Sequence, residues 1–512
     1  MISTFSGLET ARRGMMSQQS ALSTTGHNIA NANTPGFSRQ RVNFQATSPY
    51  PGVGMNRPAI PGQVGTGVEA GSIQRVRDYF LDQQYRGEAN KQGYWEAKND
   101  ALARMEDIMN EPSDEGLSKT LNQFWQSLQD LSANPQDSGA RSVVRERGEA
   151  VADTFRYISN SLTNIQQDLG DQIGVTVKDI NSILDQISSI NRQISEIEPN
   201  GYLPNDLYDE RDNLVDQLSS LLNVKVEKNT SGGNALPIAE GTYNIFVMDS
   251  QGNKTYLVQG NTVNRLSVQP SDSNGNPTGP IAEIDCNGQK LDIDFTKLAD
   301  NDTFQGKLRG LIESYGYTDG TAVKGHYPDM LKQLDSMAKA FIEKFNDVHR
   351  QGYGLSKTSP NTNTGNDFFS GTTAKDIQVV IDKDHLDHIA AALPDASGNV
   401  FSGDASNAKK LADVKNNTLT IDGNTTTIQS YYESAIGRMA VDAQKANRLV
   451  KNSEVLAQSV DHKRQSVSGV SLDEEMTNLI QFQHAYNASA RMITTVDQIL
   501  DKIINGMGVV GR

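Results

Sequence analysis

A run of apolar residues at helical spacing, from Val151 to Ile197, constrains this 512-residue chain more than any other feature. An aliphatic or aromatic residue recurs every three or four positions, which is the pattern of one buried helix face. The eleven-residue step from Leu169 to Ile180 is a stutter, which locally unwinds a left-handed supercoil. At 1.5 Å per residue, such a helix is about 70 Å long. The run therefore predicts a rod rather than one compact globule.

The two ends of the chain predict two further amphipathic helices. The C-terminal one carries an alternating three-and-four stripe typical of a coiled-coil seam, interrupted by Ser489: Leu479, Phe482, Tyr486, Ile493, Val496 and Leu500. The N-terminal one carries smaller residues and ends at Pro35 and Gly36. Neither stripe is wide enough to fold alone, so each helix needs a partner. The spacing leaves open whether that partner is the other end of the same chain or another subunit.

Between the helical stretches, two segments have β character. Residues 224–302 contain short apolar runs separated by turn sequences such as Asn274-Gly275 and Asn287-Gly288. Residues 351–429 are irregular, with a hairpin predicted around Asp422-Gly423. The pattern is nested, with terminal helices outside, long helices next and β insertions inside. We therefore expect a mainly α fold with inserted antiparallel β domains, in which the terminal helices pair as a coiled coil.

The expected domain division follows this nesting. It comprises a terminal coiled-coil domain of residues 1–45 and 471–512, a long-helix rod of residues 46–223, 303–350 and 430–470, a β domain of residues 224–302, and a second irregular or β insertion of residues 351–429.

Composition excludes several classes of function. The net charge of -15 argues against a general nucleic-acid surface, which needs a basic face. No stretch of about 18 apolar residues is present, so no membrane insertion is expected. The first residues lack the apolar core of a secretory signal. A single cysteine, Cys286, cannot form an internal disulfide and is expected to be a small buried residue in a strand.

We identify no catalytic residue set, no cofactor motif and no metal site in the sequence, and we expect a protein that is not an enzyme. His385 and His388, with Asp384 and Asp387 beside them, form the one local cluster of ligand-type residues. Their spacing suits a shared helix face, but the required third ligand is not evident. We interpret the cluster as a solvated polar loop. The acidic run from Asp473 to Glu475 is interpreted as helix capping.

Both ends resemble a known family. The sequence from Asn28 to Gly36, N-I-A-N-A-N-T-P-G, is similar to the N-terminal signature of bacterial flagellar axial proteins, which include rod, hook and hook-associated proteins. The continuation F-S-R-Q, and the C-terminal sequences V-S-L-D-E-E-M and Q-F-Q-H-A-Y, resemble the hook-associated members more closely than the hook protein. These motifs cover about eighty residues.

This resemblance implies a structural subunit of the extracellular bacterial flagellum. It implies a ring on the hook tip, at the hook–filament junction, that contacts other copies of itself, the hook protein and the third hook-associated protein (FlgL). It also implies secretion through the flagellar type III export apparatus, with an export chaperone (FlgN) on the C-terminal helix. The terminal helices would be disordered in monomers and would fold together on assembly, forming an inner coiled-coil tube.

Carried over to this sequence, the resemblance assigns roles to two groups of residues. The first group would set the turn that leaves the inner helix: Asn28, Ile29, Asn31, Asn33, Thr34, Pro35 and Gly36. The second group, which would make packing and assembly contacts, consists of the six residues of the C-terminal stripe. Two alternatives remain, namely another axial subunit such as a hook or rod protein, and a secreted hydrolase carried on axial-family ends with its cleft within residues 352–430.

Overall fold

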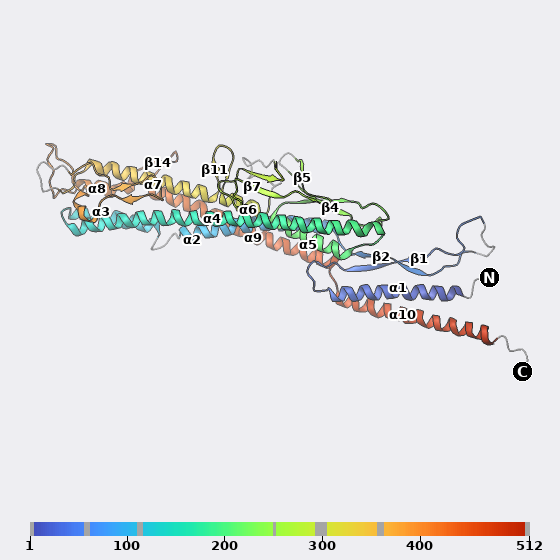
Figure 1. The fold of residues 1–512 in the computed structure, drawn as a ribbon. Coiled ribbons are helices and arrows are strands. Elements are labelled where there is room, and N and C mark those ends of the chain that lie inside the picture. Colours follow the sequence, from blue (N-terminus) through green and yellow to red (C-terminus); the bar gives the residue numbers. More distant parts are fainter. Residues whose placement is uncertain are drawn as a thin grey trace, which may run out of the picture.

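The computed structural model describes residues 5–55, 62–109, 116–248, 252–291, 305–355 and 363–506. It is a rod of packed helices with a separate helix pair at one end, where both termini lie (Figure 1). The longer helices are α1 (Phe5–Ala30), α2 (Tyr79–Met109), α3 (Leu117–Ala133), α4 (Ser138–Ile197), α5 (Asn205–Leu221), α6 (Lys307–Tyr315), α7 (His326–Gln351), α8 (Ser406–Asp413), α9 (Ile428–Ser468) and α10 (Leu472–Asp501). Short turns are η1 (Glu198–Asn200), η3 (Lys383–His388), η4 (Val414–Asn416) and η5 (Lys502–Gly506). The fold is mainly α with inserted β sheets, as predicted.

Helix α4 contains the predicted apolar run and forms the axis of the rod. It begins before that run, at Ser138, because the side chain of Asp137 accepts hydrogen bonds from the backbone N–H groups of Gly139 and Ala140, both at 3.1 Å. The stripe is buried from Val144 to Ile194. The helix ends at η1 and Gly201, whose φ of 82° is the left-handed value that glycine adopts without strain.

The other long helices pack along α4 and along one another. Helix α2 contacts α9, α6 and α5, while α3 and α7 contact α4 (Figure 1). Six buried phenylalanines form a cluster at the end of the rod away from the termini: Phe124, Phe155, Phe341, Phe345, Phe368 and Phe369. Among the described residues, no helix is both long enough and apolar enough to cross a membrane.

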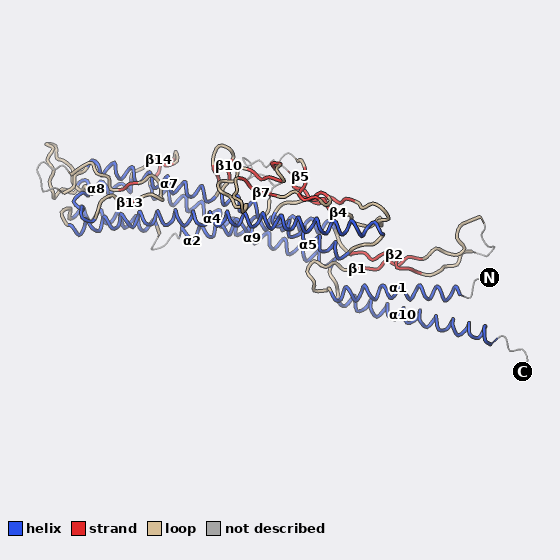
Figure 2. The backbone as a smooth tube through the Cα atoms, in the orientation of Figure 1, coloured by secondary structure: helices blue, strands red, loops and turns tan. Residues whose placement is uncertain are grey.

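The strands form small antiparallel sheets against the helices (Figure 2). One sheet has the order β3 (Lys225–Asn229), β4 (Thr242–Met248), β5 (Lys254–Gln259), β6 (Thr262–Val263), and a second has β7 (Leu266–Gln269), β8 (Glu283–Cys286), β9 (Gln289–Lys290). Two-stranded pairs are β1 (Gln40–Ala46) with β2 (Val68–Arg75), β10 (Tyr317–Thr318) with β11 (Val323–Lys324), β12 (Phe369–Ser370) with β13 (Gln378–Val379), and β14 (Leu419–Ile421) with β15 (Asn424–Thr426).

Two asparagines on α4 hold the larger sheets in place. The Asn191 amide donates to the carbonyls of Tyr243 (2.9 Å) and Gly260 (3.1 Å), and its oxygen accepts from the Tyr243 N–H (3.0 Å). Asn181 exchanges two bonds of 2.8 Å with the backbone of Leu266. A polar residue in an apolar stripe is stable here because every hydrogen-bonding group of its amide that faces the sheet finds a backbone partner.

Some elements differ from the sequence-based expectation. The pair β1–β2 crosses the predicted domain boundary at residue 45, since its register joins Gln40 to Arg75 and Ala46 to Val68. The segment 351–429 contains helix α8 in addition to the predicted hairpin, which forms as β14–β15. Cys286 is buried in β8, as predicted, and burial raises the pKa of its thiol to about 11.

The buried side chain of His349 should make the stability of the folded protein depend on pH. It is fully buried, Ala390 N–H donates to its Nε2 (3.0 Å), and its Nδ1 faces the carbonyl of Asn366 (2.8 Å), so the ring is held in one neutral tautomer. Burial lowers the pKa of His349 to about 4. The unfolded chain therefore takes up this proton first as pH falls. We expect the full stabilisation above about pH 6.5 and a loss of about 3 kcal/mol on approaching pH 4.

Urea unfolding at pH 7 and pH 4.5 would measure this effect. His349→Gln should be less stable at pH 7 but should lose less stability between the two pH values than the parent protein. His462→Gln, which changes an exposed histidine on α9, should lose as much as the parent. An equal loss in His349→Gln and the parent would exclude His349 as the source.

Candidate assembly site

Helices α1 and α10 lie side by side at one end of the molecule, and the rod extends away from them (Figure 1). We use the name seam for the six predicted residues of α10, all of which are half-buried on one face of that helix: Leu479, Phe482, Tyr486, Ile493, Val496 and Leu500. The Phe482 ring also lies edge-on against Phe44 of β1, with centroids 6.0 Å apart. Helix α10 is therefore packed along α1 and also touches β1 at Phe44.

Two glycines of α1, Gly7 and Gly14, face α10. A Cβ atom built on Gly14 would lie 3.2 Å from Ser489 Oγ, and one built on Gly7 would lie 3.8 Å from Val496 Cγ2. Ser489 interrupts the apolar stripe in the sequence, yet it sits where a small residue permits close approach. A large side chain at either Gly14 or Ser489 would push the helices apart.

Apolar side chains remain uncovered on this pair. Met476, Ile480, Met492 and Ile499 of α10 are each about half exposed, and so is Phe5 of α1. A groove of about 860 Å³ runs between the pair and the loop that joins β1 to β2, lined by Gly7, Ala11, Tyr50, Val64, Ala488 and Met492 among others. Contiguous exposed apolar surface is typical of a surface that another molecule covers.

Asn28 connects the end of α1 to both β1 and α10. Its side chain is buried, and it exchanges two bonds with the backbone of Gln40, from Nδ2 to the carbonyl (2.8 Å) and from the Gln40 N–H to Oδ1 (2.9 Å). The same Nδ2 donates to Glu475 at 3.1 Å. Of the predicted signature residues, Asn28 is the one that the structure buries.

The rest of the signature forms the turn after α1. Asn31 donates from its backbone and from its side chain to the carbonyl of His27, each at 3.1 Å, and it accepts from Thr34 Oγ1 at 3.2 Å. Ile29 is half-buried, whereas Asn33, Thr34, Pro35 and Gly36 are exposed. Gly36 has a φ of 81°, and a Cβ there would lie 3.3 Å from the Asn213 side chain. The turn thus requires glycine for both its backbone angle and its contact with α5.

The acidic start of α10 does more than cap a helix. Ser471 stands at the N-cap position but its side chain makes no capping hydrogen bond. Instead, Arg39 Nε donates to Glu475 (2.8 Å) and Arg39 Nη1 to Glu474 (2.6 Å). Glu475 is almost fully buried. The capping interpretation was therefore incomplete, because it overlooked the arginine that follows the signature turn.

A cluster of buried charges joins the β1–β2 pair and α9 to the rod. We call it the joint; it consists of Arg75, Arg77, Arg86, Arg464, Asp82, Asp209, Asp212, Asp216 and Glu240. Arg75 of β2 binds Asp209 (2.7 Å) and Asp212 (3.0 Å) of α5. Arg464, near the end of α9, binds Asp216 of α5 and stacks on Tyr85. The joint thus fixes the base of the helix pair to the rod.

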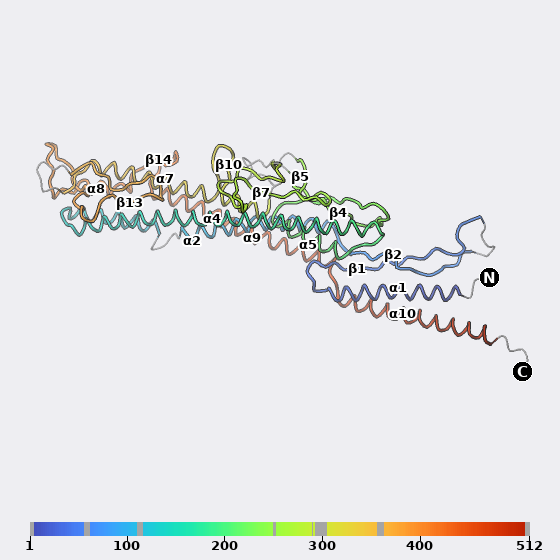
Figure 3. Tube along the Cα trace, in the orientation of Figure 1, coloured from blue at the N-terminus to red at the C-terminus, as the bar shows by residue number. Residues whose placement is uncertain are grey.

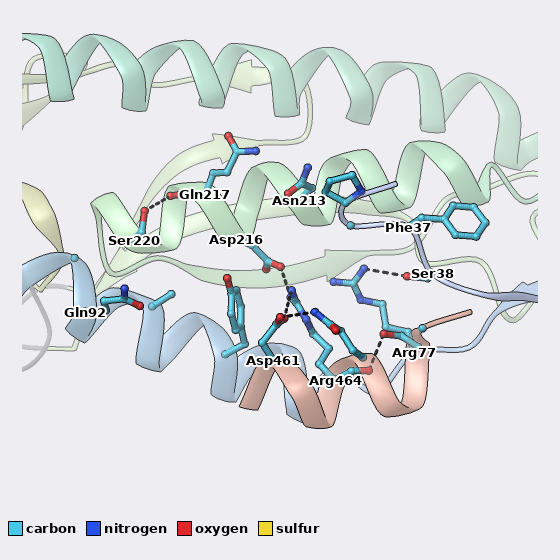
Figure 4. A pocket seen from close by; sticks show the side chains of 18 of the residues that line it. Phe37, Ser38, Arg77, Gln92, Asn213, Asp216, Gln217, Ser220, Asp461 and Arg464 are labelled. Atoms are coloured by element: carbon cyan, nitrogen blue, oxygen red, sulfur yellow. Dashed lines mark hydrogen bonds and ion pairs between the residues drawn. The ribbon is translucent and has the colours of Figure 1, made fainter. Parts of the chain in front are cut away.

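Figure 4 shows the groove above the joint, with Arg464 pointing toward Asp216 and Asp461, and Arg77 toward Ser38. The groove has a volume of about 650 Å³, and it is lined by the signature turn, α2, α5 and the end of α9. Sequence patterns gave no sign of it, because its members come from separate segments spread between Pro35 and Gly469.

Within the joint, burial and neighbouring positive charges shift the pKa values of the carboxyl groups in opposite directions. Burial alone would raise the pKa of Asp212, but the guanidinium groups of Arg77, Arg75 and Arg86 outweigh it and hold that pKa below its usual value. Glu240 follows the same balance, with burial opposed mainly by Arg75, and its pKa is lowered to about 2. Asp209 is the exception, because burial dominates and raises its pKa. The joint is most strongly paired when Asp212 and Glu240 are ionised.

Family comparisons agree with this arrangement. Residues 102–369 match the family described as flagellar hook-associated protein FlgK helical domain. Residues 463–506 match the flagellar basal body rod FlgEFG protein C-terminal family, and residues 8–37 match the flagella basal body rod protein family. The last two matches cover α10 and most of α1, which are the helices that form the pair.

Individual relatives extend over the whole chain. Flagellar hook-associated protein 1 of Bacillus subtilis is 47% identical over 526 residues, covering 100% of both chains. The protein of the same description from Escherichia coli is 25% identical and covers 97% of this chain and 99% of that one. A solved structure, that of the flagellar hook junction protein FlgK from Burkholderia pseudomallei, has a similar fold, with a TM-score of 0.57 at 14% identity over 76% of this chain and 100% of that one.

Proposed function

This chain belongs to the flagellar hook-associated protein 1 (FlgK) family, and from that premise we propose how it builds the junction between hook and filament. It is a structural subunit of that junction and not an enzyme, and it is part of the extracellular flagellum. Its partners are therefore the hook and other axial proteins. The hydrolase alternative is set aside, because the family is structural.

The helix pair is the proposed means of assembly, and one observation carries this proposal. Two helices packed on each other leave Met476, Ile480 and Met492 uncovered on α10. Neighbouring copies that pack their own pairs alongside would cover this surface and form an inner coiled-coil ring. The seam residues would then hold α10 to α1 and β1, and the signature from Asn28 to Gly36 would set the angle between the pair and the rod.

The proposed arrangement gives each part of the chain a place. Residues 1–45 and 471–512 form the inner ring, and the long-helix part, residues 46–223, 303–350 and 430–470, extends outwards from it. The insertions 224–302 and 351–429 lie on the outside. The β1–β2 pair, which spans the first boundary, packs on α1 and supports the inner ring.

Specific binding partners are part of the same proposal. The ring stands on the hook protein and receives the third hook-associated protein (FlgL). The subunit travels through the flagellar type III export apparatus, while the chaperone FlgN covers the C-terminal helix. The uncovered apolar residues of α10 support a chaperone there, since an exported chain with such a surface would otherwise aggregate.

Deletion of the gene would test the junction role directly. We expect bare hooks in electron micrographs and unpolymerised flagellin in the medium. Normal filaments on the deletion strain would overturn the proposal, and missing hooks would move the protein to an earlier axial position.

Hydrogen exchange of the dilute monomer would test folding on assembly. We expect amides of α1 and α10 to exchange within seconds, while those of α4 stay protected, because a two-helix pair with half-exposed contacts is marginally stable alone. Slow exchange throughout both terminal helices of the monomer would show that the pair forms before assembly.

A further inference from the structure

The turn η3 holds the sequence's one cluster of ligand-type side chains. It contacts α4, and the N-terminal end of α4 lies at the end of the rod away from both termini (Figure 3). The cluster is thus far from the helix pair and the joint, and the assembly role makes no use of it.

The structure brings three ligand-type side chains together here. Ligand atoms of His385, Asp387 and His388 all lie within 4.8 Å of one another. The two imidazole rings are stacked, with centroids 5.1 Å apart and planes inclined by 16°. The backbone of η3 is kinked at His385, where φ is -124° and ψ is 42°, so the two rings meet across this kink rather than along a regular 3₁₀ turn. Asp387 is the third ligand that sequence spacing alone did not reveal.

The backbone beneath these side chains is fixed. Buried Arg141 of α4 donates from Nη1 to the carbonyls of Leu386 (3.1 Å) and Ile389 (2.7 Å). The Asp387 carbonyl accepts from the Leu355 N–H and from Asn363 Nδ2, both at 2.8 Å. The positions of the three Cα atoms are therefore set by hydrogen bonds that do not involve the ligand atoms.

The ligand atoms themselves are free. Within the part of the chain that the structure describes, no hydrogen bond or ion pair engages the imidazoles or the carboxylate of this trio, and two of the three residues are exposed. Asp382 and Asp384 add negative charge beside the trio, while Lys383 points toward Glu146, 3.9 Å away. The guanidinium of Arg141 interacts electrostatically with Asp387, and the three aspartates of the turn together exceed that single positive charge.

We propose that His385, Asp387 and His388 bind one zinc-class divalent cation in a solvent-open site, with water completing the coordination. Two imidazoles and one carboxylate suit zinc and similar borderline metals better than magnesium or calcium, which prefer oxygen ligands. Ligands on one zinc ion lie about 3.4 Å apart, so small rotations of exposed side chains close the site. The bound ion links both ends of the turn and stiffens it.

Zinc titration of the purified full-length protein, monitored by a competing chromogenic chelator, would test the site. We expect one equivalent to bind, and we expect His385→Ala with His388→Ala to weaken it by at least about tenfold to a hundredfold. Asp387→Asn should weaken it less. His462→Ala with His484→Ala, which removes two exposed histidines elsewhere, should leave affinity unchanged.

Side-chain NMR signals of the histidines provide a second measurement, independent of any flagellar phenotype. Zinc should shift the signals of His385 and His388 together and saturate at one equivalent. Equal affinity in the parent and the His385→Ala, His388→Ala variant, or equal shifts at His462 and His484, would overturn the proposal. Matched urea midpoints would show that the variants fold.

Discussion

Replacing Asp212 by alanine is expected to destabilise the folded protein by about 3–5 kcal/mol, because it leaves buried guanidinium groups without their shared counter-charge. The carboxylate lies 3.0 Å from Arg75, 3.4 Å from Arg77 and 3.2 Å from Arg86, and its side chain is almost fully buried. Those arginines cannot shed their charge, and they would repel one another at short range. Urea unfolding at neutral pH, with the change in midpoint and slope, would measure the loss.

A matched control compares the loss of a buried carboxylate with the loss of an exposed one. Asp185 binds Arg265 at 3.0 Å, but both side chains are largely exposed, so Asp185→Ala should cost at most about 1 kcal/mol. Adding Arg86→Met to Asp212→Ala should recover part of the stability, because it removes one of the unbalanced charges. If Asp212→Ala costs no more than Asp185→Ala, the joint is not what holds the base of the helix pair.

The same network gives the joint a sensitivity to acid. The pKa of Asp212 is lowered in the folded protein, and that of Glu240 falls to about 2. Groups with lowered pKa values contribute stability that is fully present above their unfolded values and lost as pH falls through the folded ones. The joint should therefore be intact at neutral pH and weaken progressively below about pH 4.5, after His349 has already begun to destabilise the distal end.

Most of the rod could be predicted because a continuous apolar stripe reports one buried face directly. The part of α4 before Val151 could not, since its buried positions include Arg141 and Gly148, which carry no apolar signal. Arg141 is buried because backbone carbonyls satisfy it, and Gly148 because the Phe368 ring occupies the space of a side chain. Such positions depend on distant partners, so local periodicity cannot identify them.

The candidate site was predicted in part for the same reason. The seam was visible as spacing, whereas Glu475 was interpreted as part of an acidic run that caps the helix. It stands four residues before Leu479, which continues the three-and-four pattern of the seam, so its position was a usable signal. Its partners, Asn28 and Arg39, lie more than 400 positions away, and no local rule connects them.

Placing two carboxylates in the seam, through Phe482→Glu with Ile493→Glu, is expected to abolish filament formation while the rod stays folded. Both side chains are half-buried in the seam of the helix pair, and an unpaired charge there costs several kcal/mol. Complementation of the deletion strain should leave bare hooks and release flagellin into the medium. The urea midpoint of the purified variant should match that of the parent, because the seam lies outside the rod core.

The control for this prediction carries the same added charge at exposed positions of α9. Asn447→Glu with Asn452→Glu should restore filaments, since neither side chain is buried. Ser489→Phe tests the pairing of α1 with α10 without added charge: with Gly14 opposite Ser489 Oγ at a Cβ distance of 3.2 Å, a phenyl group cannot fit unless the helices separate. Loss of filaments in both the double-glutamate variant and Ser489→Phe, with secretion of the subunit retained, would place the defect in assembly rather than export. Filaments of normal number and length on either of these two variants would mean that the pairing of α1 with α10 is not required to build the junction.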